Sequence, residues 1–260
     1  AMNPPSTMIN SDTTMTSPAP TPQATNVSLL LSDKQTELTS EDVDYFPGSK
    51  GLYVRPKAEG KYPGVVMIHE NRGLRPEIKM MAEELAKEGY QVLALDLYKG
   101  QLVEDQPEAR SLSSGFNQEE GTRNMQAAVK YLRDKKATKI ASLGWGFGGK
   151  QSVELAISGE KLDATVVYYG DGMASTEDRL KPITWPVLGI FGDKDQVIPV
   201  EKVTEFETSM SKLGIKNEIH IYPGVRHAFT NPSGASYAPN ETKDAWGKTL
   251  NFLNTNLKPV

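Results

Sequence analysis

The sequence predicts an α/β fold in which a mostly parallel, doubly wound sheet carries helices on both faces. Short, almost continuous apolar runs alternate with longer amphipathic stretches along most of the chain. Parallel strands covered on both faces show uninterrupted apolar runs, and the helices that connect them keep one polar side. A length of 260 residues suffices to bury such a sheet. We expect a single domain over residues 27–260.

Residues 1–26 stand apart from this pattern. They are rich in Pro, Ser and Thr, contain one charged side chain, Asp12, and show no apolar periodicity. Such a composition buries too little apolar surface to offset the entropy of ordering. We expect an extension that is either a linker, as found behind the signal of an exported protein, or an arm lying along the body or a neighbouring subunit. A cytoplasmic and an exported location both stay open.

The strands follow in order from the apolar runs. Two short ones, at 41–46 and 50–55, come first and are expected to pair antiparallel. Buried strands are then predicted at 63–70, 90–98, 138–145, 163–170, 186–192 and 217–224. Their nearly continuous apolar character is typical of strands in the middle of a parallel sheet.

Amphipathic stretches between these runs predict the helices. Segment 76–89 places Ile78, Met81 and Leu85 on one face, begins with proline and ends with glycine. Proline suits the first turn of a helix, and glycine suits the residue after its end. The same pattern predicts helices at 121–136, 152–160, 200–214 and 241–257. Strands and helices that alternate in this way form parallel βαβ units.

Composition excludes several classes of partner. The formal net charge of −4 gives no electrostatic reason to expect nucleic acid or an anionic membrane. No apolar run approaches the ~18 residues of a membrane-spanning helix. The chain has no cysteine, which removes disulfides and thiolate metal sites. His69 lacks the H-E-x-x-H spacing of a zinc site, so we expect neither a metal nor another cofactor. The composition does not indicate an oligomeric state.

The segment GWGFGG at 144–149 joins a strand to a helix. Its spacing matches the nucleophile elbow G-x-Nuc-x-G of α/β-hydrolases, a turn so tight that its flanking positions need glycine. Gly146 stands at the central position. The same glycines also fit a generic turn or a phosphate-binding loop at a helix N-terminus. A dinucleotide site is disfavoured, because the loop follows about the fifth strand and no acidic residue ends the next one.

Candidates for the other two members of a triad follow in the expected order. Asp195 and His227 come directly after the last two predicted strands, so both belong at the carboxyl edge of the sheet, where ligand sites form. His227 would serve as general base, and Asp195 would orient its ring. Asp193 competes for the acid role but is expected to be a solvated turn residue. His220 lies within a strand and is expected to be structural.

An oxyanion hole needs two backbone N–H groups aimed at the developing charge. The residue after the nucleophile normally supplies one of them, which here is Phe147. The loop after the strand at 63–70 should supply the other, and Asn71 is the candidate in that loop. Both N–H groups therefore belong to loops at the carboxyl edge of the predicted sheet.

Five sequence blocks resemble the dienelactone hydrolase (carboxymethylenebutenolidase) family in their order and spacing. The blocks are HENRGL at 69–74, LDLY at 95–98, GWGFGG at 144–149, GDKDQVIP at 192–199 and YPGVRHAF at 222–229. The resemblance covers roughly residues 47–257. It implies an α/β-hydrolase fold and the hydrolysis of small esters or lactones.

The resemblance also implies roles for single residues. The family uses a cysteine nucleophile with His and Asp, and a glutamate after the third strand that engages the resting thiol and moves away when substrate binds. By resemblance, Glu70 is this glutamate, Asp195 the acid and His227 the base. Gly146 stands where the family has its cysteine, and a glycine offers no nucleophilic atom. Ser142 lies on the incoming strand, where the turn would not present it.

Three explanations of Gly146 stay open. It is an engineered inactivating substitution, the mark of a natural pseudoenzyme, or a modified cysteine written as glycine. The first and third are favoured, because Glu70, Asp195 and His227 all persist without a nucleophile to serve. We therefore expect an ester or lactone hydrolase in an inactive or severely impaired form. The alternative is a natural pseudoenzyme that binds a small molecule.

The resemblance weakens where the family binds the carboxylate of its substrate with arginines. Four residues after the histidine this chain has Asn231, and the loop after the LDLY block has Lys99. Arg72 and Lys99 are candidate replacements for these arginines. Tyr98 and Trp145 are further candidate contacts with a small-molecule substrate. These departures favour a broader range of esters or lactones over dienelactone itself.

Overall fold

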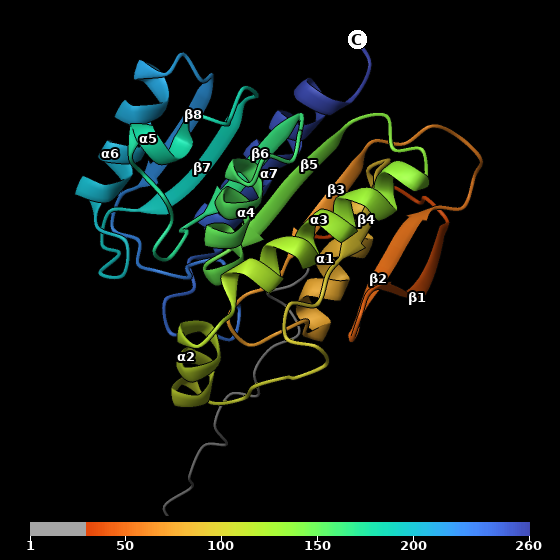
Figure 1. The fold of residues 1–260 in the computed structure, drawn as a ribbon, viewed down its shortest axis with the longest axis horizontal. Helices are drawn as coiled ribbons and strands as arrows, with labels where there is room; N and C mark the ends of the chain where they lie inside the picture. Colours follow the sequence, from red (N-terminus) through yellow and green to blue (C-terminus); the bar gives the residue numbers. More distant parts are fainter. Residues whose placement is uncertain (1–29) are drawn as a thin grey trace, which may run out of the picture.

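The computed structural model describes residues 30–260, so the extension expected at 1–26 lies outside the described residues. A twisted sheet crosses the centre of the molecule (Figure 1). Its strands are β1 (Leu38–Phe46), β2 (Ser49–Pro56), β3 (Gly64–Ile68), β4 (Gln91–Ala94), β5 (Ile140–Trp145), β6 (Ala164–Tyr168), β7 (Val187–Gly192) and β8 (Asn217–Tyr222). They lie in the order β1-β2-β4-β3-β5-β6-β7-β8. The strand β2 runs antiparallel to β1 and β4, and every other pair is parallel.

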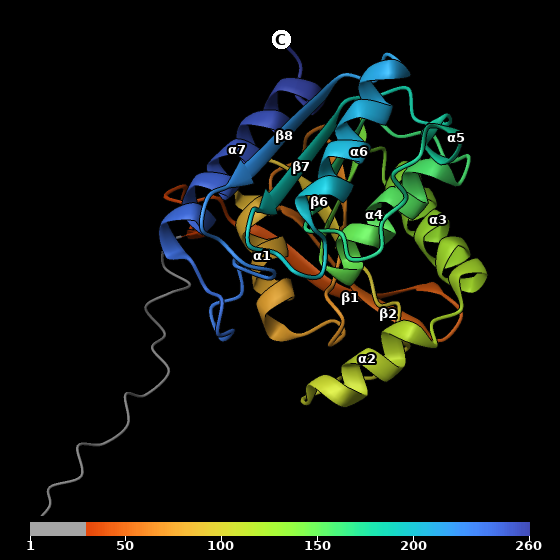
Figure 2. The ribbon, with the colours of Figure 1, turned by 90° about the vertical axis from the view of Figure 1, so that its left-hand side faces the viewer.

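Helices cover both faces of this sheet (Figure 2). They are α1 (Pro76–Lys87), α2 (Gln106–Ser114), α3 (Gln118–Asp134), α4 (Phe147–Ile157), α5 (Glu177–Leu180), α6 (Val200–Lys212) and α7 (Pro239–Leu257). Helices α1 and α7 lie on one face, and α3, α4 and α6 lie on the other. The predicted doubly wound, mostly parallel sheet with helices on both faces is therefore confirmed.

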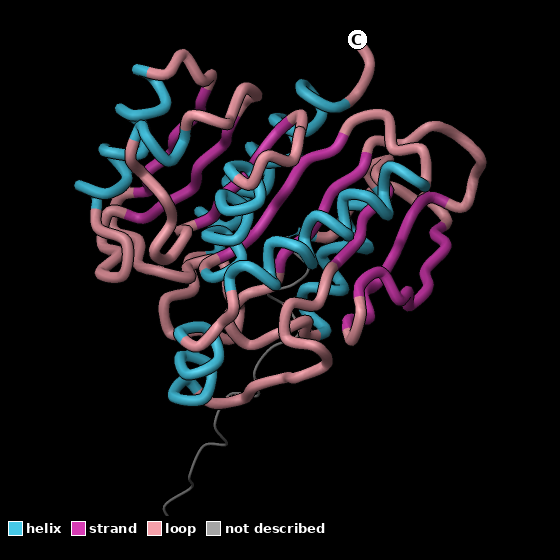
Figure 3. The backbone as a smooth tube through the Cα atoms, viewed as in Figure 1, coloured by secondary structure: helices cyan, strands magenta, loops and turns pink. Residues whose placement is uncertain are grey.

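The core lies where the predicted apolar runs meet. Every residue of β3, β5, β6 and β7 is buried, as expected for strands covered on both faces. The outer strand β1 contains only partly buried and exposed residues instead. The backbone tube shows the short central strands and the long loops that follow their carboxyl ends (Figure 3). No helix within residues 30–260 is long and apolar enough to cross a membrane.

Two elements differ from the prediction in ways that matter for the site. Helix α4 begins at Phe147, before the predicted start at 152, because the chain coils directly out of the glycine-rich turn. Glycine is a poor helix former, so this first turn had no helical signature in the sequence. Helix α2 was not predicted, since Ala109 is its only buried residue and it shows no apolar stripe. It lies apart from the two helical layers, near the lower end of the sheet in Figure 1.

Candidate active site

The turn between β5 and α4 holds Gly146 in an unusual backbone conformation. Its φ is 56° and its ψ is −117°, a combination that residues with a side chain rarely adopt. The Gly146 N–H donates to the carbonyl of Tyr168 at 3.0 Å, and the Lys150 N–H donates to the Gly146 carbonyl at 3.0 Å. These two bonds fix the turn between β6 and the first turn of α4.

The glycines of this turn are not equivalent. A Cβ on Gly144 would lie 2.0 Å from the Gly148 carbonyl oxygen, and one on Gly148 would lie 2.3 Å from the Ile68 carbonyl oxygen. A Cβ on Gly149 would lie 2.5 Å from a backbone oxygen of β6. At Gly146, by contrast, the nearest heavy atom is Cε2 of Tyr169 at 4.0 Å. Close packing thus requires glycine at the three flanking positions, whereas position 146 has room for a side chain.

The loops after β7 and β8 bring Asp195 and His227 together. Nδ1 of His227 lies 2.7 Å from Oδ2 of Asp195. The other carboxylate oxygen, Oδ1, accepts the backbone N–H groups of Val197 and Ile198, both at 2.8 Å. The Asp195 side chain is fully buried, whereas 24% of the His227 side chain is exposed. With Nδ1 on the aspartate, His227 keeps Nε2 for proton transfer in the cleft.

Asp193 has a different partner. Its Oδ1 accepts the Gly224 N–H at 2.7 Å and so shapes the turn that leads to His227. Of the two candidate acids, the structure brings Asp195 to the histidine. His220 stays on β8, where its Nε2 lies 3.5 Å from the carboxylate of Glu218.

Glu70 follows β3 and lines the same cleft as Gly146 and His227. Burial raises the pKa of its carboxyl group, while His227 and Arg72 pull that pKa down. Tyr169 lies beside both groups, with its ring edge against the His227 ring at 5.1 Å between centroids. The Tyr169 hydroxyl is 2.6 Å from Oγ1 of Thr230, which anchors the loop after His227. The site therefore holds a carboxyl group and an imidazole around the space beside Gly146.

His69 is structural. Nδ1 lies 2.7 Å from the Glu70 carbonyl oxygen, and Nε2 accepts the Leu97 N–H at 3.0 Å. The ring is completely buried, and this burial lowers its pKa, so it stays neutral and joins the loops after β3 and β4. No group of three or more His, Cys, Asp or Glu side chains within residues 30–260 could hold a metal ion.

A cleft of about 420 Å³ unites most of the predicted site residues. Its walls include Glu70, Asn71, Arg72, Gly146, Phe147 and His227. The N–H of Phe147 belongs to the first turn of α4, where backbone N–H groups lack intrahelical partners. Asn71 faces the same space from the loop after β3. Both predicted oxyanion donors therefore belong to residues of the cleft wall.

Three predicted substrate contacts lie elsewhere. Tyr98 is buried against the rings of His69 and Phe147, and Lys99 forms an ion pair with Glu120 on α3. Trp145 is buried as well, with its ring packed on Tyr168. None of the three lines the cleft.

The carboxylate of Asp96 explains where Tyr98 and Lys99 lie. It accepts the N–H groups of Tyr98 and Gly100, at 2.9 Å and 2.6 Å, and so fixes the loop after β4 in a tight turn. The position of these two side chains follows from those bonds, which the sequence block alone did not indicate.

The wall formed by α2 was not predicted from the sequence. This helix contributes Gln106, Arg110, Ser113 and Ser114, whose spacing places them on one helical face. Lys150, Tyr169 and Asp171 complete the missed set. The signals for α2 were Asp105, which caps its N-terminus, and the proline in its first turn.

Comparison with known proteins identifies the family. The model of the Dienelactone hydrolase family matches residues 50–257. The chain belongs to this hydrolase family. A "Putative carboxymethylenebutenolidase" of Aquifex aeolicus is 29% identical over 220 residues, covering 80% of this chain and 94% of the relative. A protein of the same description from Synechocystis is 29% identical over 227 residues, covering 80% and 92%.

Solved structures agree with this membership. A dienelactone hydrolase-like promiscuous phosphotriesterase from metagenomic libraries superposes with a TM-score of 0.77 at 25% identity, covering 84% of this chain and 98% of that one. The likeness extends to α/β-hydrolases outside the family. An acylaminoacyl peptidase of Pyrococcus horikoshii shares the fold at 17% identity with a TM-score of 0.66, covering 88% of this chain and 43% of the peptidase. The α/β-hydrolase fold predicted from the sequence is confirmed.

Proposed function

We propose that this protein is a hydrolase of small esters or lactones in which Gly146 occupies the position of the nucleophile. The single observation that carries the proposal is the space at residue 146. A Cβ there would meet nothing closer than 4.0 Å, although each flanking glycine is tightly enclosed. His227, which is paired with Asp195, lines the same cleft. Without a nucleophilic atom, covalent catalysis cannot run, and this form is inactive or severely impaired.

With cysteine at position 146, the neighbouring residues have clear tasks. Nε2 of His227 takes the thiol proton and later returns it to the leaving group, while Asp195 stabilises the imidazolium. The N–H groups of Asn71 and Phe147 donate hydrogen bonds to the developing oxyanion, a contribution of about 3–4 kcal/mol per donor. Glu70 holds the resting thiol, the role implied by the family resemblance.

Charge in the cleft supports a polar substrate. The wall carries three cationic side chains, Arg72, Arg110 and Lys150, against the carboxyl groups of Glu70 and Asp171. We propose that Arg72 and Arg110, rather than Lys99, attract a negatively charged part of the ester or lactone. Arginine suits this task because its planar guanidinium matches a carboxylate.

Turnover of p-nitrophenyl acetate by the Gly146→Cys variant tests the proposal. We expect hydrolysis that rises well above the rate of the glycine form, with Gly146→Ala as the matched control that adds a Cβ but no thiol. Circular dichroism and thermal melting establish that both variants fold. A folded Gly146→Cys protein no faster than the Gly146→Ala protein rejects the hydrolase proposal. Tight, saturable binding of a small molecule by the glycine form would then favour the pseudoenzyme.

A further inference from the structure

A second cavity lies next to the cleft, between α1 and α7. It measures about 80 Å³, and its walls are largely apolar. Ile78, Met80 and Met81 contribute from α1, Trp246 from α7, and Trp145 from the end of β5. We call this cavity the apolar pocket. Trp145, which precedes Gly146 in the sequence, therefore lines this pocket and not the cleft.

Two residues belong to both cavities. Glu70 and Asn231 line the apolar pocket and also line the catalytic cleft. The two spaces therefore adjoin at these two residues. An ester bound over Gly146 would enter the apolar pocket between Glu70 and Asn231, the two residues that line both spaces.

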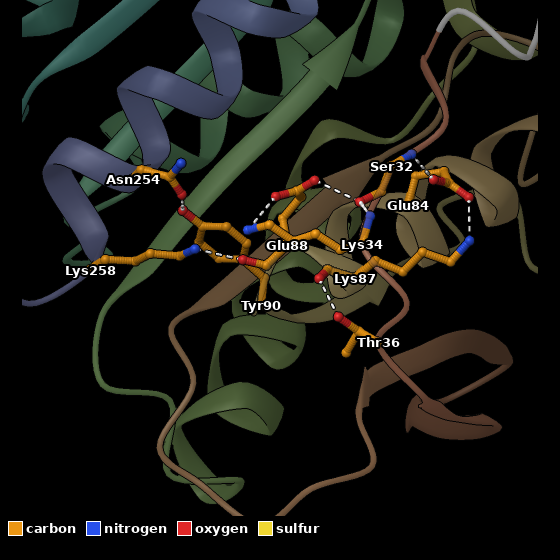
Figure 4. Close-up of polar contacts among 9 residues, drawn as sticks. All are labelled: Ser32, Lys34, Thr36, Glu84, Lys87, Glu88, Tyr90, Asn254 and Lys258. Atoms are coloured by element: carbon orange, nitrogen blue, oxygen red, sulfur yellow. Dashed lines mark hydrogen bonds and ion pairs between the residues drawn. The ribbon is translucent and has the colours of Figure 1, made fainter.

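The segment before β1 closes another wall of the apolar pocket with Leu30. Polar contacts fix this segment on the C-terminal half of α1 (Figure 4). The Ser32 N–H donates to the Glu84 carboxylate, and the Ser32 hydroxyl donates to Glu88 at 2.7 Å. Lys34 adds an ion pair with Glu88 at 2.9 Å. These bonds hold the chain two residues after Leu30.

Further contacts show that this attachment is a specific part of the fold. The Thr36 hydroxyl donates to the Lys87 carbonyl at 2.8 Å. Glu88, which binds Ser32 and Lys34, also accepts the Lys258 ammonium through its backbone carbonyl at 2.5 Å. Only 5% of Glu84 is exposed, so losing its Ser32 partner would leave a buried carboxylate with less compensation. The wall that Leu30 provides is therefore held in place by the surrounding structure.

We propose that the apolar pocket holds a short aliphatic group of the ester, on one side of the bond that is cleaved. This inference rests on the proposed function. Its volume suits a short chain and not an aromatic ring, because benzene occupies an engineered dry cavity of about 150 Å³. Each methylene group buried there strengthens binding about fourfold. Leu30 and Met81 then set the depth of the pocket, and through it the preferred chain length.

Chain-length preference in the Gly146→Cys background tests the inference. kcat/KM is measured for p-nitrophenyl esters of increasing acyl length and for alkyl acetates of increasing alcohol length. We expect one series to show an optimum. Met81→Phe, which fills the pocket, moves that optimum to shorter chains, and Leu30→Ala, which enlarges it, moves the optimum to longer chains. Leu31→Ala is the matched control, because Leu31 is 51% exposed and lies outside the pocket.

Binding to the glycine form provides a readout without turnover. Trp145 and Trp246 line the pocket, so titration with methyl butanoate should change their fluorescence in a saturable way. The change should persist in Trp185→Phe, which removes a tryptophan outside the pocket, and vanish in Met81→Phe.

The possible outcomes separate the two proposals. Turnover of p-nitrophenyl acetate with a chain-length profile that neither Met81→Phe nor Leu30→Ala shifts overturns the pocket assignment and leaves the hydrolase proposal standing. Saturable binding of methyl butanoate, with every Gly146→Cys preparation folded but inert, overturns the hydrolase proposal and retains the pocket as a binding site. If methyl butanoate does not bind and neither variant shifts the chain-length profile, the proposal that the apolar pocket binds an aliphatic group is rejected.

Discussion

The turn around Gly146 and the loops that carry Asp195 and His227 meet at one cleft, but different forces shape them. Gly144 and Gly148 are required because backbone atoms of neighbouring segments leave no room for a Cβ. Close packing does not require the side chains of Asp195 and His227. A fully buried carboxylate such as that of Asp195 destabilises the fold unless it is well paired. The fold alone therefore preserves the shape of the turn, whereas the pairing of the acid with the histidine points to chemistry.

The largest expected effect is the loss of kcat/KM when His227 is replaced. In the Gly146→Cys background, His227→Ala should lower kcat/KM for p-nitrophenyl acetate by about 10⁴-fold, because the thiol loses its base. Asp195→Asn should also cause a large loss through the wrong imidazole tautomer. Asp193→Asn is the matched control and should change the rate little, since the Asp193 side chain accepts the Gly224 N–H and an asparagine Oδ1 can accept the same bond. Equal losses from Asp193→Asn and Asp195→Asn would contradict the assignment.

Substitution of Gly148 should lower the free energy of unfolding more than substitution of Gly146. Gly148→Ala places a Cβ 2.3 Å from a backbone oxygen, so we expect a loss of more than about 4 kcal/mol or a failure to fold. Gly146→Ala meets no neighbour and carries only the strain of its backbone conformation, about 1–3 kcal/mol. Urea unfolding measures both. Equal destabilisation at the two positions would show that residue 146 is as enclosed as its neighbours.

The pH dependence of stability probes the carboxyl group beside the turn. Burial raises the pKa of Glu70 in the folded protein above its ordinary value of 4.5. The stabilisation from the neutral carboxyl is present below that ordinary value and is lost as pH rises through the raised pKa. Glu70→Gln cannot ionise, so its free energy of unfolding should rise relative to that of the parent protein as pH increases from 4.5 through the raised pKa. Urea unfolding at several pH values checks this, and a constant difference would contradict the raised pKa.

The smallest effect concerns the cations near the cleft. Arg110 lines the cleft but is exposed, so Arg110→Ala in the Gly146→Cys background should raise KM for an anionic ester only about twofold to fivefold. Lys99 pairs with Glu120 outside the cleft, and Lys99→Ala should leave KM unchanged. Steady-state kinetics with an anionic and a neutral ester distinguish charge from a general disturbance. A larger effect from Lys99→Ala would contradict the arrangement of the cleft.

Features that depend on chain pattern could be predicted from the sequence. The buried strands follow from uninterrupted apolar runs, and the carboxyl ends of parallel strands meet at one edge, which is why Asp195 and His227 were expected near Gly146. The path of a loop could not be predicted in this way where one residue determines it. Asp96 fixes the turn that carries Tyr98 and Lys99, and nothing in the apolar pattern indicates that bond.

Exposed elements could not be predicted from the apolar pattern of the sequence either. Helix α2 buries only Ala109, so it leaves no apolar stripe, yet it forms one wall of the cleft and carries Arg110. The apolar pocket depends on contacts between α1, α7 and the segment before β1, which lie far apart in the sequence. Only the packed structure brings Leu30 and Trp246 to the same cavity.

We propose that residue 146 is the nucleophile position of an otherwise complete hydrolase site. Rapid mixing of the Gly146→Cys variant with p-nitrophenyl acetate, followed by mass spectrometry of the quenched protein, tests it most directly. We expect a burst of p-nitrophenolate stoichiometric with enzyme and an acetyl group mapped to residue 146. A folded variant that shows no burst and no acetyl group at this residue would contradict the account.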